Sequence, residues 1–162
     1  RAVPALLALA RSEEKADAYE AVRALMALGP AARSAAPDLI RLMRTAESLR
    51  YLVPSALEAT APEAKVAVPL LLELLRDPDK DLASAATRGL GVFGAKARAA
   101  VPVLLERLLA EDDDRCGGYA DALGRIGGDA GVIVPVLVGA LRRAAERGGE
   151  EEDVFNDSMQ RA

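Results

Sequence analysis

The tetrapeptide AAVP at Ala99–Pro102 decides how this sequence folds, because close variants of it recur along the chain. The variants are RAVP, SAAP, VAVP and VIVP, and the five prolines lie at positions 4, 37, 69, 102 and 135. The differences between successive prolines are therefore 33, 32, 33 and 33 residues. A fixed period of roughly 20 to 50 residues is the signature of an array of structural repeats.

Apolar residues stand at fixed distances from each proline: one before it, and two, three and six after it. These positions lie on one side of an α-helix, which has about 3.6 residues per turn. Proline fits the first turn of a helix, where its missing N–H would have no partner. The pattern predicts that each tetrapeptide begins a helix. The leucines two residues after the prolines are Leu6, Leu39, Leu71, Leu104 and Leu137.

A second pattern lies between the prolines and predicts another helix in each repeat. Its conserved spacing places leucine at Leu25, Leu57, Leu90 and Leu123. Four residues further on stands a residue suited to ending a helix. These residues are Gly29, Ala61, Gly94 and Gly127. In the loop before one such helix, Asp77-Pro78-Asp79 is typical of a turn that leads into a helix start.

Each repeat is thus expected to hold two antiparallel helices. The first helix ends at the glycine-like turn, and the second begins at the proline. Because one pair cannot bury its apolar sides alone, we predict an all-α, right-handed α-solenoid of stacked pairs with 32–33 residues per repeat. The solenoid is expected over residues 1–147, as the second helix of a cut repeat, three full repeats and a second helix near 134–143. Residues 148–162 are expected to form an acidic linker and part of a truncated repeat.

The stretch DPDKDLASAATRGLGVFGAKARAAVPVLLERL at 77–108 resembles the HEAT-like repeat of the bacterial type associated with bilin lyases. Matching features are Asp77-Pro78, the Ala85-Ala86 pair, Leu90-Gly91, Gly94 and Val101-Pro102. Pro54, inside the first helix of its repeat, matches the proline kink common in HEAT first helices. The resemblance covers roughly residues 1–142.

One feature of that family is expected to be missing. Its first helices usually begin with Asp-x-Val-Arg, which gives a ladder of Asp–Arg contacts between repeats. Here only ESLR at Glu47–Arg50 approaches this motif. We therefore expect no polar ladder between the repeats.

Composition excludes several classes of function. The chain has 162 residues, no His, one Cys, no Trp and a net charge of −4. Without His it lacks the commonest general base and metal ligand, so we expect no enzyme activity, cofactor or metal. The negative charge argues against nucleic acid as the main partner. No stretch is long and apolar enough to span a membrane, and a cytoplasmic location is expected.

In such stacks the second helices line the concave face, and their exposed positions are the candidates for binding a partner. The predicted partner-binding residues are Arg11, Arg41, Arg44, Leu70, Glu73, Arg76, Val103, Glu106, Val136 and Arg142.

Two groups among these residues have alternative interpretations. The row Arg11, Arg44, Arg76 and Arg142 could grip an acidic peptide, or could be solvated side chains that complement helix C-termini. The row Leu70, Val103 and Val136 could be an exposed apolar stripe, or could be covered by neighbouring helices. Cys116 and the acidic cluster Glu111–Asp114 are interpreted as a passive small residue and a helix-start cluster.

The sequence therefore predicts a non-enzymatic HEAT-like scaffold that binds a protein or peptide, possibly an acidic one, on its concave face. The first helix missing before Arg1 and the incomplete last repeat lead us to expect a longer solenoid or fused domains. The alternative, implied by the family resemblance alone, is a bilin lyase-like subunit or a chaperone that attaches phycobilin to a phycobiliprotein.

Overall fold

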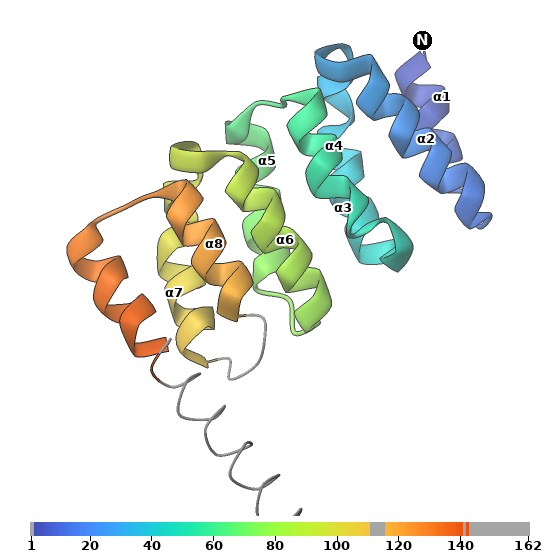
Figure 1. Cartoon of the computed structure of the whole chain (residues 1–162). Coiled ribbons are helices and arrows are strands. Elements are labelled where there is room, and N and C mark those ends of the chain that lie inside the picture. Colours follow the sequence, from blue (N-terminus) through green and yellow to red (C-terminus); the bar gives the residue numbers. More distant parts are fainter. Residues whose placement is uncertain (1, 111–115, 141, 143–162) are drawn as a thin grey trace, which may run out of the picture.

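The computed structural model describes residues 2–110, 116–140 and 142, and in this part of the chain every regular element is a helix (Figure 1). The α-helices are α1 (Ala2–Leu9), α2 (Lys15–Leu28), α3 (Ala36–Thr45), α4 (Leu52–Thr60), α5 (Ala64–Leu75), α6 (Lys80–Val92), α7 (Val101–Ala110) and α8 (Cys116–Ile126). Residues 130–140 are also helical. Three 3-10 helices, Gly29–Ala35, Glu47–Leu49 and Gly94–Ala100, lie in the connections.

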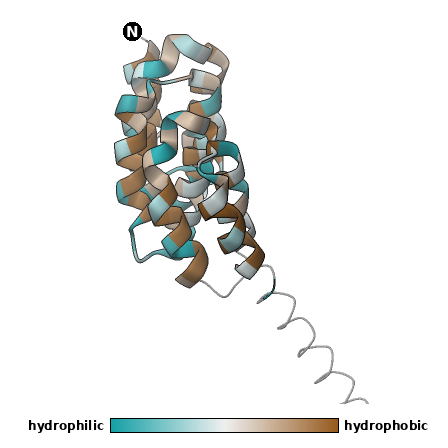
Figure 2. Ribbon diagram, turned by 90° about the vertical axis from the view of Figure 1, so that its left-hand side faces the viewer, coloured by the Kyte–Doolittle hydropathy of each residue, from teal (hydrophilic) through white to brown (hydrophobic). Residues whose placement is uncertain are grey.

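The helices form two layers. The first helices α2, α4, α6 and α8 make one layer, in which each helix contacts the next (Figure 1). The second helices α1, α3, α5 and α7 lie behind them, and their outer surface is called the second-helix face below. Along the ribbons hydrophobic and hydrophilic residues are interspersed, as expected for helices that bury only one side (Figure 2).

The second helices contact first helices other than their predicted partners. Each second helix packs against the first helix that follows it, so that α1 contacts α2, α3 contacts α4, α5 contacts α6 and α7 contacts α8. The predicted partners α2 and α3 meet through the 3-10 helix Gly29–Ala35, which contacts both. In the same way Gly94–Ala100 contacts both α6 and α7. The 3-10 segments therefore hold apart the two helices that they connect.

The leucines of both sequence patterns form the core, as predicted. Leu25, Leu57, Leu90 and Leu123 from the first helices are fully buried, and so are Leu39, Leu71 and Leu104 from the second helices. Each contributes roughly 1.5–3 kcal/mol by leaving water. Burial weakens at the two ends of the stack, where Leu6 and Leu137 are only partly buried.

Small residues let neighbouring helices approach closely. A Cβ atom added to Gly89 in α6 would lie 2.9 Å from Leu71 Cδ2 in α5. At Gly91 it would lie 3.4 Å from Arg125 Cδ in α8. Glycine destabilises a helix relative to alanine. At these two positions the helix propensity is therefore lower, and the neighbouring helix can lie closer.

The residues predicted to end the first helices all have a positive φ. Gly29, Gly94 and Gly127 have φ of +58°, +51° and +67°, and Ala61 at the equivalent position has φ of +44°. Their ψ values differ, because Ala61 with ψ of +58° is left-handed helical whereas Gly29 with ψ of −138° is not. In each case the positive φ ends the helix and turns the chain. Ala61 adopts it at a cost, because its Cβ crowds the following carbonyl oxygen.

The prediction that each proline begins a helix is only partly correct. Helices α3 and α7 do begin at the residue before Pro37 and Pro102. Helix α5, however, begins at Ala64 and contains Pro69 in its interior. The stretch 130–140 likewise begins before Pro135. The cap residue of α5, Glu63, lies two residues after Ala61, so no 3-10 segment separates the turn from the helix. Helix α5 therefore begins well before Pro69.

Pro54 interrupts its helix instead of kinking it. Helix α4 begins at Leu52, so Pro54 lies in the first turn, and the preceding residues Glu47–Leu49 form a separate 3-10 helix. Proline cannot donate to the carbonyl four residues earlier and its ring clashes with that group, which explains the break.

No helix in the described part of the chain is both long and apolar enough to cross a membrane. The expected acidic linker at 148–162 lies outside the described residues.

The left-handed residues give a direct test of the turn. We expect Ala61→Gly to raise the free energy of unfolding by about 1 kcal/mol, because glycine removes the Cβ strain. Gly94→Ala should lower it by a similar amount, since Gly94 has the same sign of φ. Urea denaturation followed by circular dichroism measures both. Destabilisation by Ala61→Gly would contradict this explanation of the turn.

Candidate functional site

The predicted partner-binding residues all lie on second helices or directly after them. Arg41 and Arg44 belong to α3, Leu70 and Glu73 to α5, and Val103 and Glu106 to α7. Arg11 follows α1, Arg76 caps α5, Val136 lies in the helical stretch 130–140, and Arg142 comes two residues after it. The charged side chains in this set are exposed. Leu70, Val103 and Val136 are partly buried and pack against the core, so they do not form a freely exposed stripe.

Two adjoining grooves bring part of this set together. The larger, of about 750 Å³, lies between the loop after α1 and the C-terminal half of α3, and its lining includes Arg11, Lys15 and Asp38. The smaller, of about 310 Å³, lies between α3 and α5, and its lining includes Leu70 and Glu73. Both grooves are lined by Arg41, Arg44 and Thr45. Arg76, Val103, Glu106, Val136 and Arg142 do not line either groove.

Two members of the predicted arginine row pair with the neighbouring repeat. Arg11 Nη2 lies 2.8 Å from Asp38 Oδ1 on α3, and Arg41 Nη1 lies 3.6 Å from the same oxygen. Arg44 Nη2 lies 3.4 Å from Asp77 Oδ2, in the loop between α5 and α6. These pairs are partly exposed, so each is worth only about 0.2–1 kcal/mol. The carboxylates nevertheless offset much of the positive charge that the sequence suggested for this row.

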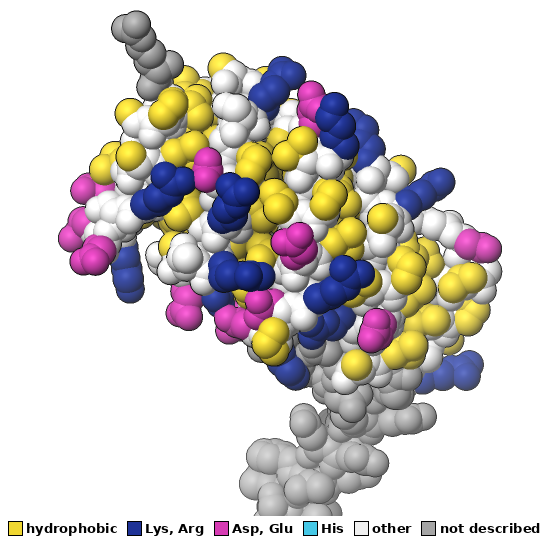
Figure 3. Space-filling model, turned by 180° about the vertical axis from the view of Figure 1, so that it is seen from behind, with side chains coloured by type: hydrophobic (Ala, Val, Ile, Leu, Met, Phe, Trp, Pro, Cys, Tyr) yellow, Lys and Arg dark blue, Asp and Glu magenta, His cyan; other side chains and the backbone are white. Residues whose placement is uncertain are grey.

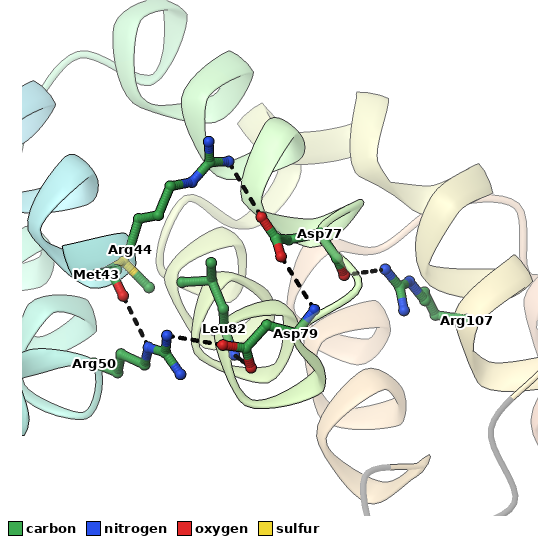
Figure 4. A network of polar contacts seen from close by, with 7 residues as sticks. All are labelled: Met43, Arg44, Arg50, Asp77, Asp79, Leu82 and Arg107. Atoms are coloured by element: carbon green, nitrogen blue, oxygen red, sulfur yellow. Dashed lines mark hydrogen bonds and ion pairs between the residues drawn. The ribbon is translucent and has the colours of Figure 1, made fainter. Parts of the chain in front are cut away.

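A buried arginine joins three helices at the centre of the molecule (Figure 4). The Arg50 side chain is 9% exposed, and its Nη2 lies 2.9 Å from Asp79 Oδ2. Its Nε donates a hydrogen bond of 2.8 Å to the carbonyl of Met43 in α3. Arg50 lies two residues before α4 and Asp79 caps α6, so one guanidinium ties α3, α4 and α6 together.

This contact corrects the expectation that no polar ladder links the repeats. Arg50 is the arginine of the ESLR motif, and it does reach an aspartate of the next repeat. The other repeats carry Ala18, Ala83 and Cys116 at the corresponding position, which cannot make such a pair. At this position the described residues therefore make one Asp–Arg contact between repeats, the Arg50–Asp79 pair.

Asp79 has two functions at this joint. Its side chain accepts hydrogen bonds of 3.0 Å from the Asp81 amide and 3.1 Å from the Leu82 amide, which caps α6 as the sequence predicted. The bond from Leu82, followed by the positive charge of Arg50, lowers the pKa of Asp79, while partial burial opposes the shift. The carboxylate is thus held in its charged form, which suits both the cap and the ion pair.

The turn before α6 collects further contacts. Asp77 Oδ1 accepts a hydrogen bond of 3.1 Å from the Asp79 amide. The Asp77 carbonyl accepts one of 2.8 Å from Arg107 Nη2 in α7. Sequence reasoning missed Arg107, because it occupies a position five residues after its proline that was assigned no function.

The second-helix face as a whole carries both signs of charge, and Lys, Arg, Asp and Glu side chains are interspersed across it (Figure 3). Among the described residues no group of His, Cys, Asp or Glu could hold a metal ion. The cluster Glu111–Asp114 and the side chain of Cys116 lie outside what the structure describes. The described part of this face therefore offers charged groups of both signs.

The contribution of the Arg50 contacts to stability can be tested by replacing Arg50 with an unbranched, uncharged residue. We expect Arg50→Met to lower the free energy of unfolding by about 2 kcal/mol, because the Met43 carbonyl and the Asp79 carboxylate both lose a partner. Arg76→Met is the matched control, since Arg76 is exposed and should change stability by less than about 0.5 kcal/mol. Urea denaturation measures the free energy of unfolding of both variants. Equal losses would show that the contacts of Arg50 stabilise the fold no more than an exposed arginine does.

Comparison of the chain with protein-family models, with curated proteins and with solved structures found no match.

Proposed function

We propose that this chain is a HEAT-like α-solenoid that acts as a non-enzymatic scaffold and binds a protein segment on its second-helix face. The observation that carries the proposal is the pair of adjoining grooves that share Arg41, Arg44 and Thr45. Together they run from the loop after α1, across α3, to α5. A peptide laid across this path would contact the loop after α1 and the second helices α3 and α5.

The lining of the grooves suits a peptide. Leu70, Leu74 and Ile40 give the smaller groove an apolar floor, which a hydrophobic side chain could enter. Arg41, Arg44 and Glu73 surround it with groups that can hydrogen-bond a peptide backbone or its polar side chains. An apolar centre with a polar rim is the usual anatomy of a protein interface.

The arrangement of the helices supports the scaffold part of the proposal. The first helices stack in one continuous layer, and a residue with positive φ follows each of α2, α4, α6 and α8. A stack of this kind presents equivalent positions of successive repeats side by side, which gives an extended binding surface. The alternative of a bilin lyase-like subunit stays a prediction from the family resemblance, and no contact in the described residues favours it.

Selection of peptides from a random displayed library on the immobilised chain tests the proposal. We expect the selected peptides to lose at least about tenfold in affinity on Thr45→Trp, because a bulky ring at the junction would fill both grooves. Ser55→Trp is the matched control, since Ser55 is exposed on α4 in the other layer. Failure to select any peptide, or equal binding to both variants, would contradict the proposal.

A further inference from the structure

Lysine and arginine side chains gather along one edge of the molecule, where the chain passes from each first helix to the following second helix (Figure 3). Arg33 lies in the 3-10 helix Gly29–Ala35, Lys65 lies in the first turn of α5, and Lys96 and Arg98 lie in the 3-10 helix Gly94–Ala100. All four are exposed. We call Arg33, Lys65, Lys96 and Arg98 the basic edge.

The basic edge follows the repeat. Arg33, Lys65 and Arg98 each stand four residues before the proline of their repeat. Because successive repeats stack, equivalent positions lie side by side along the edge. Neighbouring packed helices are about 8–10 Å apart, so the cations recur at about that interval.

The cations of this edge are less neutralised than the arginines of the second-helix face. Lys96 and Arg98 have no ion-pair partner among the described residues. Lys65 Nζ lies 2.8 Å from Glu63 Oε2, in a pair whose side chains are 80% and 57% exposed. Glu63 is the one acidic residue in the stretches 29–36, 61–66 and 94–100. Four cations and one anion give this edge a charge of +3, in a chain whose net charge is −4.

The opposite edge has the opposite charge. The loops that lead into the next first helix carry Glu13, Glu14, Glu47, Asp77 and Asp79. The same loops hold three basic residues, Arg11, Arg50 and Arg76, so five acidic and three basic residues give this edge a charge of −2. Charge is therefore separated between two edges, and the basic edge is the part of the surface that would attract an anionic partner over a distance.

We propose that the basic edge binds an extended acidic segment of a partner protein, with a carboxylate at about every third residue. A chain in the extended polyproline II conformation rises about 3.1 Å per residue with three residues per turn, so carboxylates three residues apart lie on one side and match cations about 8–10 Å apart. A nucleic acid fits less well. The three stretches of the edge contain no aromatic side chain on which bases could stack. This surface is separate from the grooves of the second-helix face, so the two can be tested apart.

The experiment measures fluorescence anisotropy of a labelled peptide of about nine residues, about 28 Å long when extended, so that glutamate at every third position gives one carboxylate to each of three repeats. At about 0.1 M ionic strength we expect saturable binding, weakened at about 1 M salt, where the screening length falls to about 3 Å. The variant Arg33→Glu, Lys65→Glu, Arg98→Glu should lose at least about tenfold in affinity. The milder variant Arg33→Gln, Lys65→Gln, Arg98→Gln should lose less, and circular dichroism checks that both fold.

A control variant with the same change in charge separates this surface from the grooves. Lys15→Glu, Arg41→Glu, Arg76→Glu alters exposed cations away from the basic edge and should leave peptide affinity within about twofold. Loss of binding in this control but not in the edge variant would overturn the proposal and favour the second-helix face. No binding to the unaltered chain, or equal binding of a single-stranded oligonucleotide of the same charge, would also overturn it. None of these results depends on Thr45. If the basic edge does not bind the peptide, the proposal that the grooves bind a protein segment therefore still stands.

Discussion

The buried guanidinium of Arg50 is the polar contact on which the centre of the molecule depends. A charge removed from water must have partners, and Arg50 finds them in the Met43 carbonyl and the Asp79 carboxylate. Since those groups belong to different helices, the requirement fixes α3, α4 and α6 relative to one another. The close approach of α6 to α5 depends instead on a small residue, Gly89, which imposes no polar geometry.

The same constraint explains which charges are left for a partner. Arg11, Arg44 and Arg50 each pair with an aspartate of the following repeat, so these cations help to hold the stack together. The cations of the basic edge lie in connections where no aspartate of a neighbouring repeat reaches them. A chain with a net negative charge thereby keeps one positively charged surface. The proposed scaffold would have two separate surfaces, a pair of polar grooves and a charged edge.

Much of the helical fold could be predicted from the sequence, because it depends on periodic residues. The buried leucines and the left-handed turn at Gly29, Ala61, Gly94 and Gly127 follow from spacing alone. The start of α5 could not be predicted from Pro69, because proline is compatible with either a first turn or a tolerated interior position. The pair between Arg50 and Asp79 could not be predicted, because the two residues lie 29 positions apart and the sequence around Asp79 indicates only a helix cap. The basic edge was visible as a column four residues before each proline, but only the stacking shows that its members are neighbours.

The most direct test of this account is to locate the bound acidic peptide on the chain. Titration of the ¹⁵N-labelled protein with the glutamate-repeat peptide, followed by NMR, reports which backbone amides change their chemical environment. The account predicts that the shifted amides gather in the three connections, at residues 29–36, 64–66 and 94–100. Shifts confined to α3 and α5 around Arg41 and Glu73, or distributed evenly over the surface, would contradict it.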